Sequence, residues 1–149
     1  MSVADIRLRA MEPEDLDFLY TMENDSDLWN VSNTSVPYSR YVLHDYIANS
    51  TNDIYNDGQV RMIIEGEDGT LMGMADLFNF NAQHCRAEVS IVVRRDCRRS
   101  GVGQAALRKV ACYALRTLHL HQLYAVIAAD NVASLALFRK EGFKPSGLL

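Results

Sequence analysis

Hydrophobic and polar residues follow two different spacings along this chain of 149 residues. Alternation, or a short apolar run between turn residues, is typical of a β-strand, whereas apolar residues three and four positions apart indicate a helix. Strand patterns occupy residues 6–9, 60–65, 71–80, 88–93 and 123–128. Helical patterns occupy residues 13–23, 39–47, 103–118 and 131–141. The chain therefore predicts an α/β (α+β) fold in which about four helices flank one sheet.

The connections predict how the strands pair. Gly66-Glu67-Asp68-Gly69 joins two strands by a tight turn, which makes them antiparallel. Residues 88–128 run strand, loop, helix and strand, and such a crossover makes its two strands parallel. We therefore expect a mixed, mostly antiparallel sheet with one parallel pair. The polar residues 25–36 predict a loop around a substrate pocket.

Composition restricts the class of protein. A chain of this length with 48% hydrophobic residues is expected to form a single globular domain, 1–149. Three cysteines without C-x-x-C spacing favour a reducing, cytoplasmic setting, and the histidines lack the clustered ligands of a metal site. No stretch is apolar enough to predict a signal peptide or a membrane span. The net charge of −4 argues against nucleic acid as a partner.

Charge is distributed unevenly along the chain. Residues 1–75 carry 4 basic and 14 acidic side chains, and residues 76–149 carry 11 basic and 5 acidic ones. Either two parts of the fold meet ligands of opposite charge, or the halves of the sequence do not correspond to parts of the fold. Four arginines gather around Asp96 and indicate a site for an anion: Arg94, Arg95, Arg98 and Arg99.

A glycine-rich turn follows these arginines at the predicted start of a helix. In Ser100-Gly101-Val102-Gly103, several backbone N–H groups can converge on a pyrophosphate at the positive end of the helix dipole. With Ala106 the turn also matches a dinucleotide-binding fingerprint, but seven residues separate it from the preceding strand and the expected acidic residue is missing. An ordinary glycine-rich helix start is the third interpretation.

The turn, the strand before it and the segment 131–143 together resemble the GNAT acyltransferases, which use acetyl-coenzyme A to acylate amines. Arg98-x-x-Gly101-x-Gly103 matches the pyrophosphate loop of that superfamily, [QR]-x-x-G-x-[GA]. Arg86-Ala87-Glu88 is similar to the spermidine and ribosomal-protein N-terminal acetyltransferase branches. The resemblance implies acetyl-CoA as cosubstrate, no metal, and direct transfer to a primary amine.

The resemblance also implies where the cofactor lies. Its pantetheine arm would add to strand 88–93 where that strand diverges from strand 123–128, with backbone amides near Val92 and Val93 at the thioester. One fixed N–H there can stabilise the oxyanion by about 3 kcal/mol. For Asn131 a helix cap, and for Ser134 a solvated helix face, are the alternatives. The implied cofactor residues are Ile91, Val92, Val93, Arg98, Arg99, Ser100, Gly101, Val102, Gly103, Gln104, Asn131, Ser134, Phe138, Arg139 and Lys140.

Glu88 is our candidate for the base that deprotonates the amine, with an ion pair to Arg86 as the alternative. Phe138 occupies the position where the family usually has a tyrosine acid, and it has no hydroxyl group. Water or Tyr124 then protonates the thiolate, or the thiolate leaves unassisted because its pKa is only ~8.5. An acyl-CoA-binding module with weak or lost catalysis is the alternative function.

The acidic residues of the first half and the segment after residue 143 predict the acceptor and the assembly. Glu23, Asp25 and Asp27 favour a cationic acceptor such as a small amine, a polyamine or a protein N-terminus, although residues 33–37 lack the carboxylate of spermidine enzymes. Family members continue after Gly142-Phe143 with a long hairpin, whereas this sequence ends at residue 149. We expect an open sheet edge that a second subunit covers, and hence a homodimer.

Overall fold

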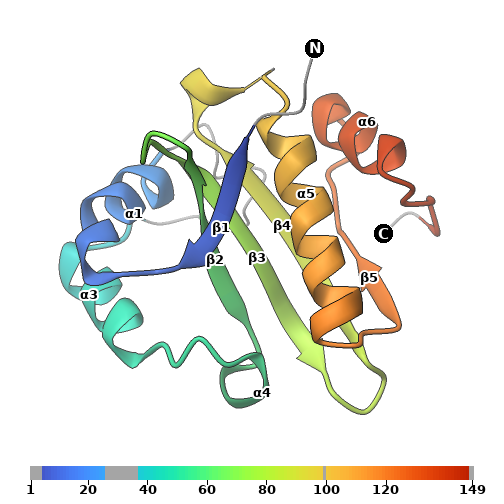
Figure 1. Cartoon of the computed structure of the whole chain (residues 1–149), viewed down its shortest axis with the longest axis horizontal. Helices are drawn as coiled ribbons and strands as arrows, with labels where there is room; N and C mark the ends of the chain where they lie inside the picture. Colours follow the sequence, from blue (N-terminus) through green and yellow to red (C-terminus); the bar gives the residue numbers. More distant parts are fainter. Residues whose placement is uncertain (1–4, 26–36, 99, 148–149) are drawn as a thin grey trace.

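Five strands form the central sheet in the order β1-β2-β3-β4-β5 (Figure 1). The structure is a computed structural model that describes residues 5–25, 37–98 and 100–147. The strands are β1 (Ile6–Ala10), β2 (Val60–Gly66), β3 (Leu71–Asn81), β4 (Arg86–Val93) and β5 (Gln122–Tyr124). Neighbours from β1 to β4 are antiparallel, and β4 and β5 are parallel. The predicted mixed sheet with one parallel pair is confirmed.

Five α-helices accompany the sheet within the described residues, one more than the sequence predicts. They are α1 (Leu16–Glu23), α3 (Arg40–Asn49), α4 (Ile54–Asp57), α5 (Val102–Cys112) and α6 (Val132–Lys140). Short 3-10 turns are η1 (Pro13–Asp15) and η2 (Arg95–Cys97), and the π-helical turn η3 (Tyr113–Thr117) extends α5. The added helix, α4, is a single turn that Asp53 caps by accepting from the Tyr55 amide, too short for a periodic pattern to reveal.

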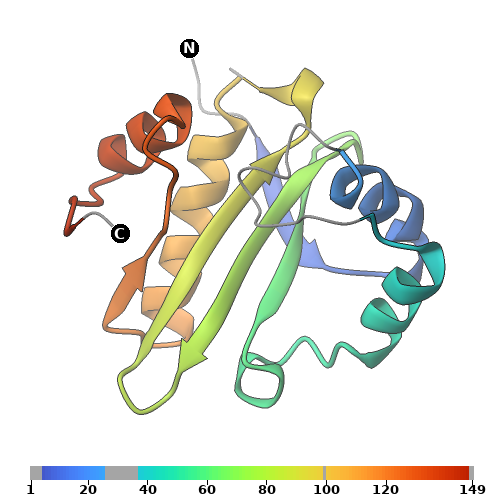
Figure 2. The ribbon, with the colours of Figure 1, turned by 180° about the vertical axis from the view of Figure 1, so that it is seen from behind.

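Helices cover the two faces of the sheet from opposite sides (Figures 1 and 2). On one face α5 and η3 bury every fourth residue against the sheet: Val102, Ala106, Val110 and, on η3, Ala114. On the other face α1 and α3 enclose a second core with Leu19, Leu43, Ile63 and Met74. Because side chains alternate along a strand, neighbouring positions of β2 and β3 serve different cores.

The two halves of the sequence occupy different sides of the molecule. The acidic half forms β1, β2, α1, α3 and α4, and the basic half forms β4, β5, α5 and α6 (Figure 1). The uneven charge of the sequence is therefore an uneven charge of the folded domain. No helix in the described ranges is both long and apolar enough to cross a membrane.

An ionic network ties β1 to β2 and η1. Arg9 donates twice to Asp15 and once to Glu65, each at 2.8 Å. Asp15 is buried, and its carboxylate also accepts from the Glu12 amide at 2.8 Å. Burial disfavours the Asp15 charge, but the hydrogen bonds from Arg9 and the Glu12 amide, together with the Arg9 charge, outweigh it, and the pKa of Asp15 lies below its usual value. Hydrogen bonds from Arg9 and Arg7 likewise lower the pKa of Glu65.

Candidate functional site

The parallel strands β4 and β5 diverge after three residue pairs. Glu88 and Tyr124 form the last pair, while β4 continues to Val93. The predicted strand 123–128 therefore ends early, and residues 125–128 follow it without a strand ladder. Beyond Glu88, β4 presents an unpaired backbone edge on its β5 side within the described chain. The splayed pair that the resemblance implies is present.

The direction of each backbone amide on this edge follows from two hydrogen bonds. The Cys85 carbonyl accepts from His121 on the β5 side at 2.7 Å, and the Arg94 amide donates to Met72 on the β3 side at 2.6 Å. Backbone groups alternate in direction along a strand. The amides of Ile91 and Val93 therefore face the open edge, and that of Val92 faces β3.

This corrects the prediction for the Val92 amide, which belongs to the β3–β4 ladder. The Val92 carbonyl faces the same way, so close to Gly73 on β3 that a side chain at that glycine would collide with it. The Val92 side chain packs against the core below α1 and α3.

The glycine turn lies at the end of the open edge. Gly101 has a φ of 84°, and α5 starts directly after it. Ala105 is the first residue of this turn whose amide bonds within the helix, to the Gly101 carbonyl at 3.0 Å. The amides of Val102, Gly103 and Gln104 have no acceptor in the described chain. A Cβ added to Gly103 would lie 3.7 Å from Val93 Cγ2, so the free amides adjoin the open edge of β4.

The arginines around Asp96 have separate partners. Arg94 bonds Asp96 at 2.6 Å, and Arg95 bonds Asp25 at 2.9 Å. Arg98 is exposed and donates to the Val93 carbonyl at 3.1 Å, beside the open edge. Arg99 lies outside the described residues. The four arginines are thus not four equivalent anion ligands, because carboxylates neutralise two of them.

Helix α6 contributes its first turn to the same region. The Asn131 oxygen caps α6 by accepting from the Ser134 amide at 3.2 Å, so the cap interpretation is confirmed for that atom. The Asn131 NH₂ group has no acceptor among the described residues. Ser134 is half-buried, and Arg139 and Lys140 are exposed in the last turn.

A carboxylate that the sequence patterns do not single out joins α6 to α5. Glu141 accepts from Gln104 Nε2 at 3.1 Å and from Arg108 Nε at 2.5 Å. The hydrogen bond from the Arg108 guanidinium lowers the pKa of Glu141, and the hydrogen bond from Gln104 has a smaller effect in the same direction. The side chain of Gln104 is therefore engaged between the helices, and its backbone amide is the group left without a partner among the described residues.

Phe138 is a core residue. Its side chain is 5% exposed and meets Phe143 edge-to-face at 5.0 Å between ring centres. The ring fills the space between α6 and the sheet, so only a small exposed part of the side chain is left for the predicted contact with the cofactor. Tyr124, in contrast, is half-buried and lies opposite Glu88 in register, on the same face of the sheet.

Glu88 is held by a residue that sequence reasoning missed. Asn79 Nδ2 donates to Glu88 Oε1 at 3.1 Å. Among the described residues Glu88 forms no ion pair with Arg86, so that alternative is wrong. The sequence offers no signal for this contact, because the eight residues between Asn79 and Glu88 include a turn whose register only the folded ladder fixes.

A second polar cluster lies on the face of the sheet that carries Glu88. Arg61 bonds both oxygens of Asp76 at 2.9 Å and Glu23 at 2.6 Å, and lies 5.5 Å from the Tyr46 ring. Burial opposes the Arg61 charge, but Asp76 outweighs it, and the pKa of Arg61 is raised. Burial also raises the pKa of Tyr46.

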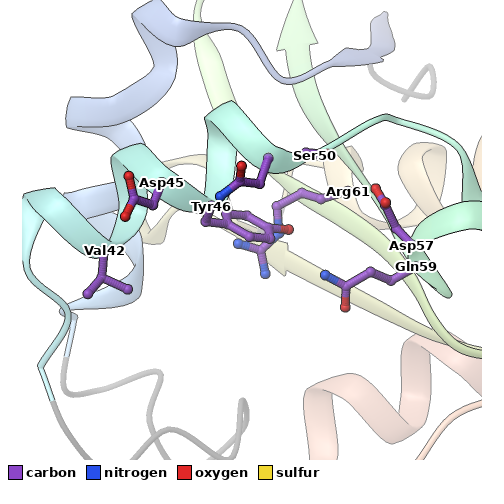
Figure 3. Close-up of a pocket in the computed structure, with 8 residues that line it drawn as sticks. Val42, Asp45, Tyr46, Ser50, Asp57, Gln59 and Arg61 are labelled. Carbon is purple, nitrogen blue, oxygen red and sulfur yellow. The ribbon is translucent and has the colours of Figure 1, made fainter.

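Arg61 and Tyr46 of this cluster line a cavity of about 230 Å³ between α3, α4 and β2 (Figure 3). Asp45 on α3 and Asp57 on α4 also line this cavity. Glu23 and Asp25, predicted to attract a cationic acceptor, are both engaged by arginines, and Asp27 lies outside the described residues.

Three features lie together at this site: a diverging pair of parallel strands, free backbone amides at the start of the helix beside it, and a carboxylate at the last residue pair of the ladder. Together they define an acyltransferase of the GNAT type, which takes its acyl group from a thioester. The chain belongs to this family: the Acetyltransferase (GNAT) domain matches residues 5–144. It is therefore an acetyl-CoA-dependent N-acetyltransferase that acts on an amine, rather than a dinucleotide oxidoreductase. Among the described residues no cluster of three or more potential ligands is placed to hold a metal ion.

Similar proteins indicate the branch of the family to which the chain is related. The sequence is 26% identical to a spermidine N(1)-acetyltransferase of Escherichia coli over 99% of this chain and 77% of that protein. It is 24% identical to the spermidine N(1)-acetyltransferase of Vibrio cholerae over 97% and 82%. A Vibrio cholerae spermidine N-acetyltransferase solved with CoA and spermine superposes with a TM-score of 0.90 at 23% identity, covering 97% of this chain and 84% of that one. The predicted branch is confirmed.

Proposed function

We propose that this protein acetylates a polyamine, with Glu88 as the base that deprotonates the accepting ammonium group. One observation carries the assignment: Glu88 and Tyr124 form the last rung of the parallel pair, where the strands diverge. A carboxylate and a phenol thus lie side by side at the inner end of the open edge of β4. The names of the similar spermidine enzymes support a polyamine as acceptor.

Acetyl-CoA would bind along the open edge. The free amides of Val102, Gly103 and Gln104 hold the pyrophosphate at the positive end of α5. The amides of Ile91 and Val93 hold the pantetheine arm, and Ile91, nearer the last rung, faces the thioester oxygen. The groups that complete the nucleotide and pantetheine contacts are Arg98, Arg99, Ser100, Gly101, Asn131, Ser134, Arg139 and Lys140.

The reaction follows from this arrangement. Glu88 takes a proton from the ammonium group, and the free amine nitrogen attacks the thioester carbonyl carbon. The carbonyl oxygen becomes an oxyanion that accepts the Ile91 N–H. The C–S bond then breaks, the nitrogen loses its second proton to solvent, and the thiolate of CoA takes the phenolic proton of Tyr124. Solvent restores the Tyr124 proton and takes up the proton held by Glu88. The products are the N-acetylated amine and free CoA, with no acyl-enzyme.

The test is release of CoA thiol from acetyl-CoA with spermidine, spermine, a simple alkylamine and a peptide with a free N-terminus. We expect the polyamines to give the highest kcat/KM and Glu88→Gln to lower kcat by about 100-fold or more. Glu67→Gln, in the exposed β2–β3 turn, is the matched control and should retain full activity. Tight CoA binding without thiol release for any amine would instead identify a binding module.

We also propose that the chain forms a homodimer in the cytoplasm. Within the described sheet β5 is an edge strand, and Val126 and Val132 nearby are 57% and 73% exposed. All three cysteines are free thiols, as a reducing compartment requires. A related Vibrio cholerae enzyme is described as dodecameric. Light scattering at micromolar concentration should give at least twice the mass of the chain, and a monomer would contradict the proposal.

A further inference from the structure

Asn79 lies where the ladder between β3 and β4 changes register. Phe78 is opposite Glu88 and Asn81 is opposite Arg86, so β3 has one residue more than β4 between these pairs. Asn79 has a φ of 49°, in the left-handed region that asparagine tolerates better than most residues. A bulge of this kind re-aims a side chain, and such bulges occur beside active sites.

The side chain re-aimed here reaches the catalytic carboxylate. Asn79 Nδ2 donates to Glu88 Oε1 at 3.1 Å. A carboxylate only accepts hydrogen bonds, so the NH₂ end of the amide must face it. Within the described chain the Glu88 side chain makes this one hydrogen bond. It fixes one oxygen and leaves the other, Oε2, for the acceptor.

The charged and titratable neighbours of Glu88 do not take over this role. On the same face of the sheet lie Arg86 along β4, Asp76 on β3 and Tyr124 on β5. Asp76 is bound to Arg61 through both of its oxygens, and no ion pair joins Arg86 to Glu88 in the described chain. The orientation of the Glu88 carboxylate therefore depends on the neutral amide at the bulge.

We propose that Asn79 is a positioning residue: its amide holds the Glu88 carboxylate so that Oε2 faces the acceptor nitrogen. The inference rests on Glu88 being the base in the proposed function. The amide is neutral, so it holds the carboxylate by a hydrogen bond without adding charge to the site.

The experiment compares three substitutions at this position. Asn79→Ala removes the amide, and Asn79→Gly removes it while keeping a residue that adopts positive φ freely. Both should lower kcat about tenfold and leave the KM for acetyl-CoA unchanged, because only the approach of the base to the amine is affected. Asn79→Asp should move the acid limb of the kcat–pH profile to higher pH, because two adjacent carboxylates resist ionising together.

Asn52→Ala is the matched control, because Asn52 also has a positive φ, 58°, and lies in a loop away from β4. Asn52→Ala should lower the melting temperature and leave kcat unchanged. In a Glu88→Gln background, Asn79→Ala should have no additional effect on kcat, since two residues that act as one unit are not additive.

The possible results separate the two claims. Unchanged kcat in Glu88→Gln would refute the base assignment itself. A slow Glu88→Gln with normal Asn79→Ala and Asn79→Gly would overturn only the role of Asn79. A slow Asn79→Ala with a normal Asn79→Gly would assign the effect to the backbone of the bulge, and additive losses in the double variant would assign it to another contact. Each of these last two outcomes also overturns the proposed role of Asn79.

Discussion

The hydroxyl that the family usually places on α6 is missing, and the structure shows why restoring it should not help. Phe138 is buried with its ring edge against Phe143. We expect Phe138→Tyr to leave kcat unchanged and to lower stability by about 1–3 kcal/mol, because the new hydroxyl is buried without a partner. Thiol-release kinetics and thermal unfolding measure the two effects. A rise in kcat would show that the native enzyme lacks an acid.

Tyr124 is the residue expected to supply the proton instead. Tyr124→Phe removes the hydroxyl without changing the ring, so kcat should fall about tenfold while the KM for acetyl-CoA stays the same. Tyr113→Phe, on η3 behind the sheet, is the control and should retain kcat. Equal rates for wild type and Tyr124→Phe would leave water or unassisted departure of the thiolate as the mechanism.

At the scale of single residues, sequence patterns carry little information about which side chains bond to one another. They single out Glu88 as a carboxylate at the start of the central strand, which in the structure begins two residues earlier, but the partner they offer, Arg86, is wrong, and Asn79 does not stand out. The partner of a strand residue depends on register across the ladder, and a one-residue bulge changes it without leaving a pattern in the sequence.

At the scale of elements, the start of α5 depends on one backbone conformation. Gly101 has a φ of 84°, which costs a residue with a side chain about 1–2 kcal/mol. Gly101→Ala should distort the turn and weaken CoA binding about tenfold, as measured by titration calorimetry. Gly58→Ala is the matched control, with a φ of 71° and open space around it. It should lose stability but keep its CoA affinity, and equal affinities in both variants would contradict the role of the turn.

The predicted elements differ from the observed ones mainly where pairing is absent. The apolar run 123–128 predicts six strand residues, whereas β5 ends at Tyr124 because β4 diverges from it. Hydrophobic residues beyond that point are still partly buried, Ala125 and Ile127 among them, so the pattern reports burial rather than pairing.

At the scale of the whole molecule, the Arg9 network links stability to pH. The pKa values of Asp15 and Glu65 are lower in the folded state than the usual ~4 of the unfolded chain. Between the unfolded and the lower folded pKa values, the unfolded state therefore binds more protons than the folded state. The stabilisation is fully present above about pH 5, begins to fall near pH 4, and is lost as the pH falls through the lowered pKa values of the folded state.

Replacing Arg9 should remove much of this dependence. Arg9→Met is expected to lower the melting temperature by several degrees at pH 7, and by progressively less as the pH falls below about 4 and the carboxylates become protonated. Glu14→Gln, an exposed neighbour in η1, is the control and should not alter the slope. A constant difference between wild type and Arg9→Met at all pH values would assign the effect to packing.

The sequence by itself determined the class of fold, the order of the elements and the glycine turn before α5, because each depends on residues close together in the chain. Tertiary structure decided which amides of β4 face the open edge, where β5 ends, which carboxylates neutralise the arginines and which amide holds Glu88. These properties depend on register and on contacts between distant segments, and side-chain spacing along one segment cannot encode the geometry of another.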